Sequence, residues 1–343
     1  MSRPGRNTRS GRRSLQLASI GSLALFLLLP AAVYLASGSA DGFVHGKSQP
    51  EWPTLQALIA PDPEGRAQLA EALLDRLALR REAIRLRNRI TWRGLAYIDT
   101  DLVVSGADGW LFYKPALRAW DCEHHAVLDR GLHRLHLLLD LTEVNDVPLV
   151  IAIAPNKASI HRGAMTGRAA HYGRCYFDYE ARFRSVLESH DAPRVIDHAR
   201  VLDPLQHREE TYLRTDTHWN RKYAYQAIAQ LAAEVGIGHP SESDPEIILE
   251  DKVTDLGNQI LLMESPEPNP TVVLSRPPSG AQTGVDAPHI MIIHDSFYQE
   301  ASEYLAAMIP NATLSNINYR EFRNQSLDDV DVLVLASAER AIL

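Results

Sequence analysis

The sequence predicts an α/β domain with a mainly parallel β-sheet, preceded by an N-terminal membrane anchor and an amphipathic helix. Three observations lead to this prediction. Short, continuous apolar runs alternate with helical patterns, which is typical of parallel strands buried on both faces. An uncharged apolar stretch follows a cluster of arginines near the N-terminus. Between these two regions, apolar residues recur every three or four positions, as on one face of a helix.

The first 40 residues have the pattern of a membrane-targeting segment. Five arginines and no acidic residue lie within residues 1–13, and residues 14–40 carry no charge. About 20 apolar helical residues cross a bilayer, and flanking arginines keep their end in the cytoplasm. We therefore expect a cytoplasmic basic tail over residues 1–13 and a transmembrane signal anchor over residues 14–37. Small residues at 37–40 leave cleavage by a signal peptidase open.

The composition of the remaining chain limits its possible partners and its redox compartment. Without the five N-terminal arginines, 30 basic side chains stand against 43 acidic ones. An acidic surface is poorly suited to nucleic acid, so we expect no nucleic-acid partner. The two cysteines, Cys122 and Cys175, predict one disulfide in an oxidising compartment. The alternative is a metal site that adds His124 and His125 to the two cysteines.

We expect residues 38–94 to form a stalk and an amphipathic helix. Residues 41–62 are rich in Pro, Gly and Ser, and residues 64–90 repeat apolar positions at helical spacing and end in a basic run. The basic side chains favour a solvated helix face, with contact to anionic lipid or polymer as the alternative. The pattern of a folded domain begins at residue 95 and continues to residue 343.

In this domain, the predicted elements alternate along the chain. Strands are expected at residues 148–155, 194–197, 289–293 and 330–336. Helices are expected at residues 132–145, 176–190, 219–235 and 299–308. A further strand is expected just before Tyr319. The proline-rich residues 265–288 predict a loop. Alternation of this kind places a largely parallel sheet between helices on both sides.

A serine follows the predicted strand at residues 289–293. In the segment IHDSF, Ser296 lies where a strand ends and a helix begins. Parallel α/β sheets carry reactive groups at this edge, and backbone N–H groups there can stabilise an oxyanion. Asp295 and Ser296 are also common helix-capping residues, so the serine alone is a weak signal.

The segment TDTHWN supplies the partners that such a serine needs. Asp216 and His218 are two residues apart just before the helix predicted at residues 219–235. A serine hydroxyl becomes nucleophilic when a histidine takes its proton, and a carboxylate orients and stabilises that histidine. The spacing therefore permits a catalytic triad in which Asp216 orients His218 and His218 activates Ser296. A capping role for Asp216 and a packing role for the His-Trp pair are the alternatives.

Five segments together resemble the alginate O-acetyltransferase-type branch of the SGNH hydrolase-like proteins. They read GADGWLF (106–112), APNKASI (154–160), TDTHWN (215–220), IHDSF (293–297) and DVLVLASAER (331–340). The resemblance covers most of residues 95–343. It implies a three-layer α/β/α sandwich with Ser296 as nucleophile, His218 as general base and Asp216 as its orienting carboxylate.

The same resemblance implies the reaction and its setting. The expected activity is acetyl transfer through an acyl-serine to hydroxyls of an extracellular polysaccharide such as alginate, with no metal or other cofactor. The expected partners are the polysaccharide, a membrane-bound O-acyltransferase that delivers acetyl, and the bacterial inner membrane, with the catalytic domain in the periplasm. A carbohydrate esterase of the same fold, or an inactive polymer-binding subunit of a secretion complex, are the alternatives.

Five further residues are candidates for contact with the substrate or the oxyanion. His294 stands where the resembled family commonly has glycine, so its side chain either crowds the oxyanion position or donates to it. Asn156 and Lys157 follow the strand expected at residues 148–155. Tyr319 and Arg320 follow another expected strand. A plain turn at the end of the strand is the alternative for Asn156 and Lys157.

Overall fold

The computed structural model describes most of the domain and little of the N-terminal region. The described residues are 67, 80–118, 125–144, 147–189, 194–202, 211–235, 246–263, 266–273, 288–301, 304–305, 308–309, 312–318 and 326–342. The segments expected as the basic tail, the anchor and the stalk lie outside them, so these stay predictions. Within the described part, no helix is both long enough and apolar enough to cross a bilayer.

The described part of the predicted amphipathic helix contains the helix α4, Arg80–Leu95. Leu86 and Ile90 are exposed on it. Asn88 is buried and its side chain donates to the Leu261 carbonyl at 3.0 Å. Residues up to Gly94 group with residues 259–263 in one compact unit, and residues 95–258 with 264–343 form a second. The second unit contains the sheet.

The central sheet confirms the predicted α/β class. Its strands are β3 (Leu149–Ala154), β4 (Val195–Asp197), β7 (His289–His294), β8 (Thr313–Asn318) and β9 (Val332–Ala338). They lie in the order β4-β3-β9-β7-β8, and every neighbouring pair is parallel. All six residues of β3 are buried, because the sheet is covered on both faces.

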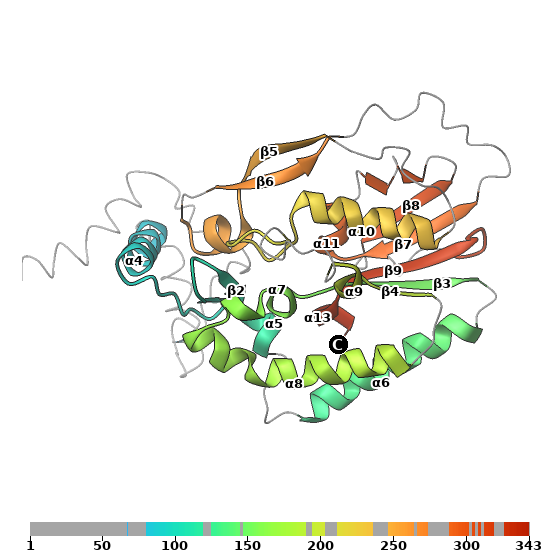
Figure 1. Cartoon of the computed structure of the whole chain (residues 1–343), viewed down its shortest axis with the longest axis horizontal. Coiled ribbons are helices and arrows are strands. Elements are labelled where there is room, and N and C mark those ends of the chain that lie inside the picture. Colours follow the sequence, from blue (N-terminus) through green and yellow to red (C-terminus); the bar gives the residue numbers. More distant parts are fainter. Residues whose placement is uncertain are drawn as a thin grey trace, which may run out of the picture. The chain divides into compact units, whose positions relative to one another are not determined.

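Helices form the outer layers. Figure 1 shows α6 (His125–Val144) and α8 (Gly167–Ser189) on one side of the sheet and α10 (Arg221–Glu234) on the other. Shorter helical turns sit at strand ends and in loops: α5 (Lys114–Arg118), α7 (Lys157–Ile160), η1 (Arg162–Ala164), α9 (His198–Leu202), the π-helical turn Asp255–Ile260, α11 (Ser296–Gln299) and α13 (Glu339–Ile342). The predicted helices at 132–145 and 176–190 begin earlier than expected. For the helix predicted at 299–308, α11 starts already at Ser296.

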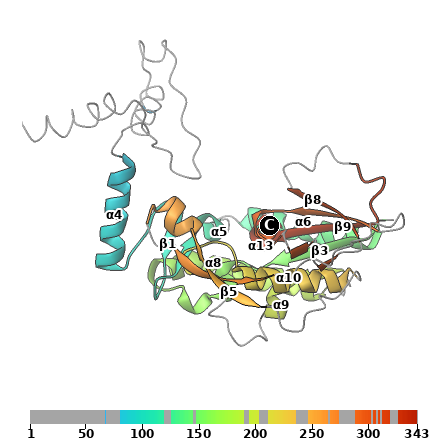
Figure 2. The same cartoon turned by 90° about the horizontal axis from the view of Figure 1, so that it is seen from above.

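Two small antiparallel hairpins lie outside the sheet. One pairs β1 (Val103–Ser105) with β2 (Leu111–Tyr113) and turns through Asp108 and Gly109, both at positive φ. The other pairs β5 (Ile247–Lys252) with β6 (Glu267–Val272). This second hairpin lies beside α10 (Figure 1 and Figure 2), where Arg221 N donates to Asn269 Oδ1 at 3.2 Å.

The strand β6 corrects the prediction of a loop over residues 265–288. The prolines Pro268 and Pro270 pair with Asp251 and Leu249, and the neighbouring ladder bond from Val273 N to Glu246 O fixes the alternation. Successive N–H groups point to opposite sides of a strand, so both prolines stand where an N–H would point away from β5. Proline is tolerated at such positions.

A buried network of polar side chains around Arg184 fixes the turn α13 to the rest of the unit. Glu339 is fully buried. Its carboxylate lies 3.2 Å from Arg184 Nη2 of α8 and accepts from Asn156 N at 3.3 Å. Arg184 also pairs with Asp197 at the end of β4. Burial raises the pKa of Glu339 to about 7, although Arg184 opposes this shift.

This network predicts a specific dependence of stability on pH. Folded Glu339 holds its proton up to about pH 7, whereas an unfolded glutamate releases it near pH ~4.3. The folded state therefore binds more protons between these values, and its stability falls as pH rises through them. In Glu339→Gln this loss, on the order of 3 kcal/mol, is absent.

Urea unfolding of both proteins across this pH range measures the difference. The matched control is Glu188→Gln, because Glu188 lies on the same helix α8 with its side chain 61% exposed. The control should follow the wild-type pH profile. Parallel profiles for wild type and Glu339→Gln would contradict the assignment.

Candidate active site

The loop between β4 and α10 carries Asp216 and His218. An isolated bridge joins Tyr212 to Trp219, so the intervening residues are closed into a compact turn. Trp219 is fully buried, and its indole N–H donates to the Phe297 carbonyl at 3.1 Å. This bond links the loop directly to the residue after Ser296.

Other side chains hold the same loop from two directions. Glu267 on β6 accepts from Arg214 N and Thr215 N, each at 2.7 Å. From the turn after β3, the buried ammonium of Lys157 donates to the Arg214 carbonyl at 2.7 Å and to the Asp216 carbonyl at 2.9 Å. The loop therefore has a fixed backbone before any substrate is present.

Ser296 lies at the carboxyl edge of the sheet, as expected from its position after a strand. The strand β7 ends at His294, and Asp295 then caps α11 by accepting from Phe297 N at 2.9 Å. The other oxygen of Asp295 accepts from Ala338 N at 2.7 Å. This second bond ties the turn to the end of β9 and leaves the Ser296 side chain exposed.

The structure brings Asp216, His218 and Ser296 together in one hydrogen-bonded series. His218 Nε2 lies 3.0 Å from Ser296 Oγ, and His218 Nδ1 lies 2.9 Å from Asp216 Oδ1. A carboxylate only accepts hydrogen bonds, so we assign the proton to Nδ1 and leave Nε2 free to accept from the serine. In this arrangement a histidine can take the proton of a serine nucleophile.

The charged groups around Asp216, His218 and Ser296 favour a protonated His218 and an ionised Asp216. Burial alone would raise the pKa of Asp216, but the hydrogen bond from His218 and the ammonium of Lys252, 3.4 Å away, hold it well below its usual range. Burial likewise would lower the pKa of His218. Asp216 outweighs this effect, with smaller contributions from Asp255 and Glu300, so the pKa of His218 is raised.

Three of these charged neighbours were not singled out from the sequence. Asp255 accepts from Thr217 N at 2.7 Å and also from the Thr217 hydroxyl. Lys252 pairs with Glu300 at 2.6 Å. Burial, followed by the nearby Asp216 carboxylate, raises the pKa of Asp255. No motif marks these residues, because each is an ordinary charged residue at the end of a strand or helical turn.

The same cluster offers atoms to a cation. One atom each from Asp216, His218 and Asp255 lie within 4.8 Å of one another. The protein already supplies a positive charge here through Lys252, and the Nδ1 of His218 is used in the hydrogen bond to Asp216. The alternative metal site at Cys122 and its neighbours falls largely outside the described residues. The Cys122–Cys175 link stays a prediction for the same reason.

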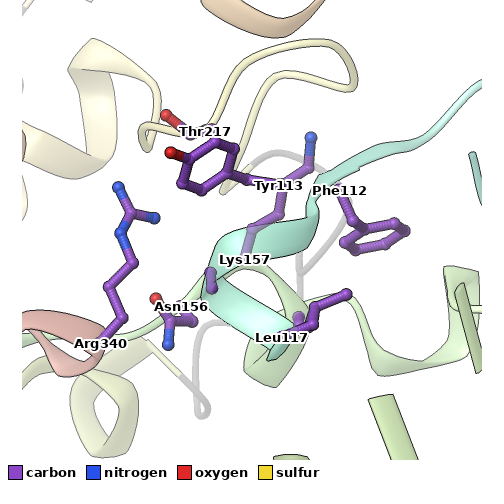
Figure 3. Close-up of a pocket in the computed structure, with 9 residues that line it drawn as sticks. Phe112, Tyr113, Leu117, Asn156, Lys157, Thr217 and Arg340 are labelled. Carbon is purple, nitrogen blue, oxygen red and sulfur yellow. The ribbon is translucent and has the colours of Figure 1, made fainter. Parts of the chain in front are cut away.

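The remaining candidates take different positions. His294 is buried, and its Nδ1 lies 2.9 Å from the Asp295 carbonyl oxygen. Lys157 is occupied by the loop carbonyls, and burial lowers its pKa to about 7. Asn156 lines a pocket (Figure 3). Tyr319 and Arg320 lie outside the described residues.

The electrostatics predict the effect of neutralising the orienting carboxylate. In Asp216→Asn, the His218 imidazolium loses its main favourable partner while burial still opposes its charge. We expect the pKa of His218 to fall by about 1 unit or more, measured by NMR titration of the histidine ring protons. Asp251→Asn on the exposed face of β5 should leave this pKa unchanged. An unchanged titration in Asp216→Asn would show that the hydrogen bond does not govern the imidazole.

Comparison with known proteins shows what part of the domain is similar to. Residues 103–262 match the family model of the SGNH hydrolase-like domain of acetyltransferase AlgX. The probable alginate O-acetylase AlgJ of Pseudomonas aeruginosa is 34% identical over 149 residues, which are 40% of this chain and 34% of that protein. The match therefore spans about a third of the length of this curated relative.

Solved structures of two proteins are also similar to this chain. The O-acetyltransferase domain of Pseudomonas putida AlgJ has a TM-score of 0.46 and 18% identity, covering 70% of this chain and 92% of that one. Pseudomonas aeruginosa AlgX has a TM-score of 0.43 and 16% identity, covering 69% of this chain and 61% of that one. The match of residues 103–262 to the SGNH hydrolase-like domain of acetyltransferase AlgX agrees with the resemblance carried by the sequence motifs.

Proposed function

We propose that this protein is an O-acetyltransferase that carries the acetyl group on Ser296 and transfers it to a polysaccharide hydroxyl. The main support for the proposal is the chain of hydrogen bonds that joins the three residues. In it, His218 Nε2 lies 3.0 Å from Ser296 Oγ, and His218 Nδ1 lies 2.9 Å from Asp216 Oδ1. The match of residues 103–262 to a domain model named for an acetyltransferase supports acetyl as the transferred group.

The reaction proceeds in two balanced steps. In the first, Ser296 Oγ attacks the acetyl carbonyl carbon while its proton passes to His218 Nε2, and the leaving group departs with that proton. In the second, Nε2 takes the proton of an acceptor hydroxyl, whose oxygen attacks the acetyl-serine ester. The bond to Ser296 breaks, and the serine recovers a proton from His218. Asp216 stabilises the imidazolium in both steps.

The oxyanion of each tetrahedral intermediate needs hydrogen-bond donors. We assign the backbone N–H of Ser296 as the first of them, since it belongs to the nucleophile itself. The ring of His294 is buried and directed at the Asp295 carbonyl. In a neutral ring whose Nδ1 donates to this carbonyl, Nε2 carries no proton to donate to the oxyanion, so we assign the ring to packing behind the serine turn.

The sequence and the curated relative together suggest the setting. The uncharged stretch after the N-terminal arginines supports an anchor in a bacterial inner membrane with the domain in the periplasm. A curated relative named as a probable alginate O-acetylase supports an exopolysaccharide such as alginate as acceptor. Acetyl would reach this side of the membrane through a membrane-bound O-acyltransferase partner.

Exposure of Ser296 makes hydrolysis the competing outcome. Water can reach an exposed acyl-serine as readily as a sugar hydroxyl, unless the acceptor is bound close by. An esterase would release free acetate, and a polymer-binding subunit without catalysis would release neither product. These alternatives differ in the product formed, and one assay separates them.

The first test of the proposal follows the product. Full-length protein in detergent is incubated with a chromogenic acetyl ester and neutral or acidic oligosaccharides, and mass spectrometry identifies acetylated sugar. Ser296→Ala should reduce turnover by about a thousandfold or more, as loss of a nucleophile does. Ser189→Ala, an exposed serine on α8, is the control. Release of free acetate without acetylated sugar would indicate an esterase. Equal turnover in wild type and Ser296→Ala would contradict both the transferase and the esterase hypotheses.

The second test uses the pH dependence of turnover. His218 must be neutral at Nε2 to accept a proton, and its pKa is raised, so kcat/KM should rise with pH through a value above that of an ordinary histidine. Glu300 contributes to this shift. In Glu300→Gln the rise should therefore move to lower pH by a few tenths of a unit.

The control for this profile is Glu234→Gln, which changes an exposed glutamate at the end of α10. Its profile should superimpose on that of the wild type. A rise that stays in place in Glu300→Gln, or moves to higher pH, would show that His218 is not the group that titrates.

A further inference from the structure

The end of strand β5 brings a lysine to the charged groups around Asp216. Five of the six residues of β5 are exposed, whereas the last one, Lys252, is partly buried. Its side chain is 17% exposed, and a charged side chain is seldom withdrawn from water unless it is paired. The register pairs Lys252 with Glu267, whose carboxylate binds the backbone of the loop that carries His218. This end of the hairpin is therefore docked on that loop.

The ammonium of Lys252 lies between two carboxylates that belong to different parts of the site. It donates to both oxygens of Glu300, at 2.8 and 2.6 Å, and lies 3.4 Å from Asp216 Oδ2. Glu300 directly follows α11, the short helix that begins at Ser296. Lys252 therefore joins the carboxylate that orients His218 to the helix that carries the nucleophile.

This contact gives the two oxygens of Asp216 different partners. Oδ1 accepts from the backbone N–H and the ring of His218, at 2.8 and 2.9 Å. Oδ2 accepts from Asp255 N at 3.2 Å and faces the ammonium of Lys252. The terminal torsion of an aspartate is soft, but charged partners bind carboxylate oxygens strongly. A cation at Oδ2 therefore opposes a rotation that would take Oδ1 away from the imidazole.

Lys252 also offsets the negative charge around the His218 ring. Carboxylates lie 2.9, 3.6 and 3.9 Å from its Nδ1, and they belong to Asp216, Asp255 and Glu300. Cations face this region from the end of β5, the turn after β3 and the turn α13, and they are Lys252, Lys157 and Arg340. Lys252 contacts two of the three carboxylates directly. Its charge therefore reduces their combined attraction for a proton on the imidazole.

We propose that Lys252 is a positioning residue for acetyl transfer. Its ammonium holds Asp216 in the orientation that serves His218 and ties this carboxylate to the helix that begins at Ser296. The part that concerns acetyl transfer rests on the proposed function. The two ion pairs belong to the resting protein, so they can be tested without turnover.

The titration of His218 in the resting full-length protein tests these ion pairs. In Lys252→Met, the carboxylates lose the cation that offsets them, so the protonated imidazole is stabilised more strongly. The pKa of His218 should rise by about half a unit or more, measured by NMR of the histidine ring protons. Lys252→Arg keeps the charge and should titrate within about 0.2 unit of the wild type. The matched control, Arg182→Met, removes an equal charge from an exposed position on α8 and should titrate as the wild type does.

A double variant separates the ion pair from a general disturbance of the fold. Glu300→Gln alone should lower the pKa of His218, whereas Lys252→Met alone should raise it. Lys252→Met/Glu300→Gln removes both charges, so its titration should lie between those of the two single variants. A purely structural role for Lys252 would not produce shifts of opposite sign. Near-ultraviolet circular dichroism checks the fold of each variant, and Lys252→Gln replaces Lys252→Met if the latter is unfolded.

The acetyl ester assay then measures the role of Lys252 in turnover. Lys252→Met should lower kcat by about tenfold or more with little change in KM, because it disturbs orientation rather than ester binding. Lys252→Arg should recover part of this loss. An unchanged or lowered pKa of His218 in Lys252→Met would overturn the proposal, and so would a wild-type kcat in that variant. If the wild-type protein itself shows no turnover, the proposed function fails, and the titration alone decides whether Lys252 holds the carboxylate.

Discussion

The buried carboxylate of Asp216 is the constraint on which the site depends. With 1% of its surface exposed, an ionised carboxylate is unfavourable unless every oxygen finds donors. One oxygen accepts from the His218 backbone N–H at 2.8 Å and from its ring at 2.9 Å, and the other accepts from Asp255 N at 3.2 Å. These bonds fix the histidine ring, the loop and the following turn together. The geometry at Ser296 is a consequence of satisfying this one group.

The parallel sheet explains why distant segments meet there. The ends of β3 and β9 are in register at Ala154 and Ala338, and β7 pairs with β9 at His294. The residues just beyond these strand ends must therefore lie at one edge of the sheet: Asn156 after β3, Ser296 after β7 and Arg340 after β9. The serine, the buried network around Glu339 and the adjacent pocket share this edge because of topology, not because of sequence proximity.

The buried strands and the similarity to the AlgX-type domain could be predicted from the sequence, and much of the surrounding shell could not. Continuous apolar runs identify β3, β7 and β9, since only buried parallel strands tolerate them. The pattern missed β6, because Pro268 and Pro270 read as loop until the register shows where their missing N–H groups point. It also missed Lys252, Asp255 and Glu300. A charged residue becomes part of a site through the partner it faces, and periodicity does not reveal that partner.

The central claim is that Ser296 carries the acetyl group in a covalent ester. Mass spectrometry of peptides from the wild-type protein, quenched in acid shortly after mixing with an acetyl ester, tests it directly. The account predicts a mass increase of one acetyl group on the peptide containing Ser296, which is lost when acceptor is added and absent from His218→Ala. Formation of acetylated product while Ser296 stays unmodified at all times would contradict it.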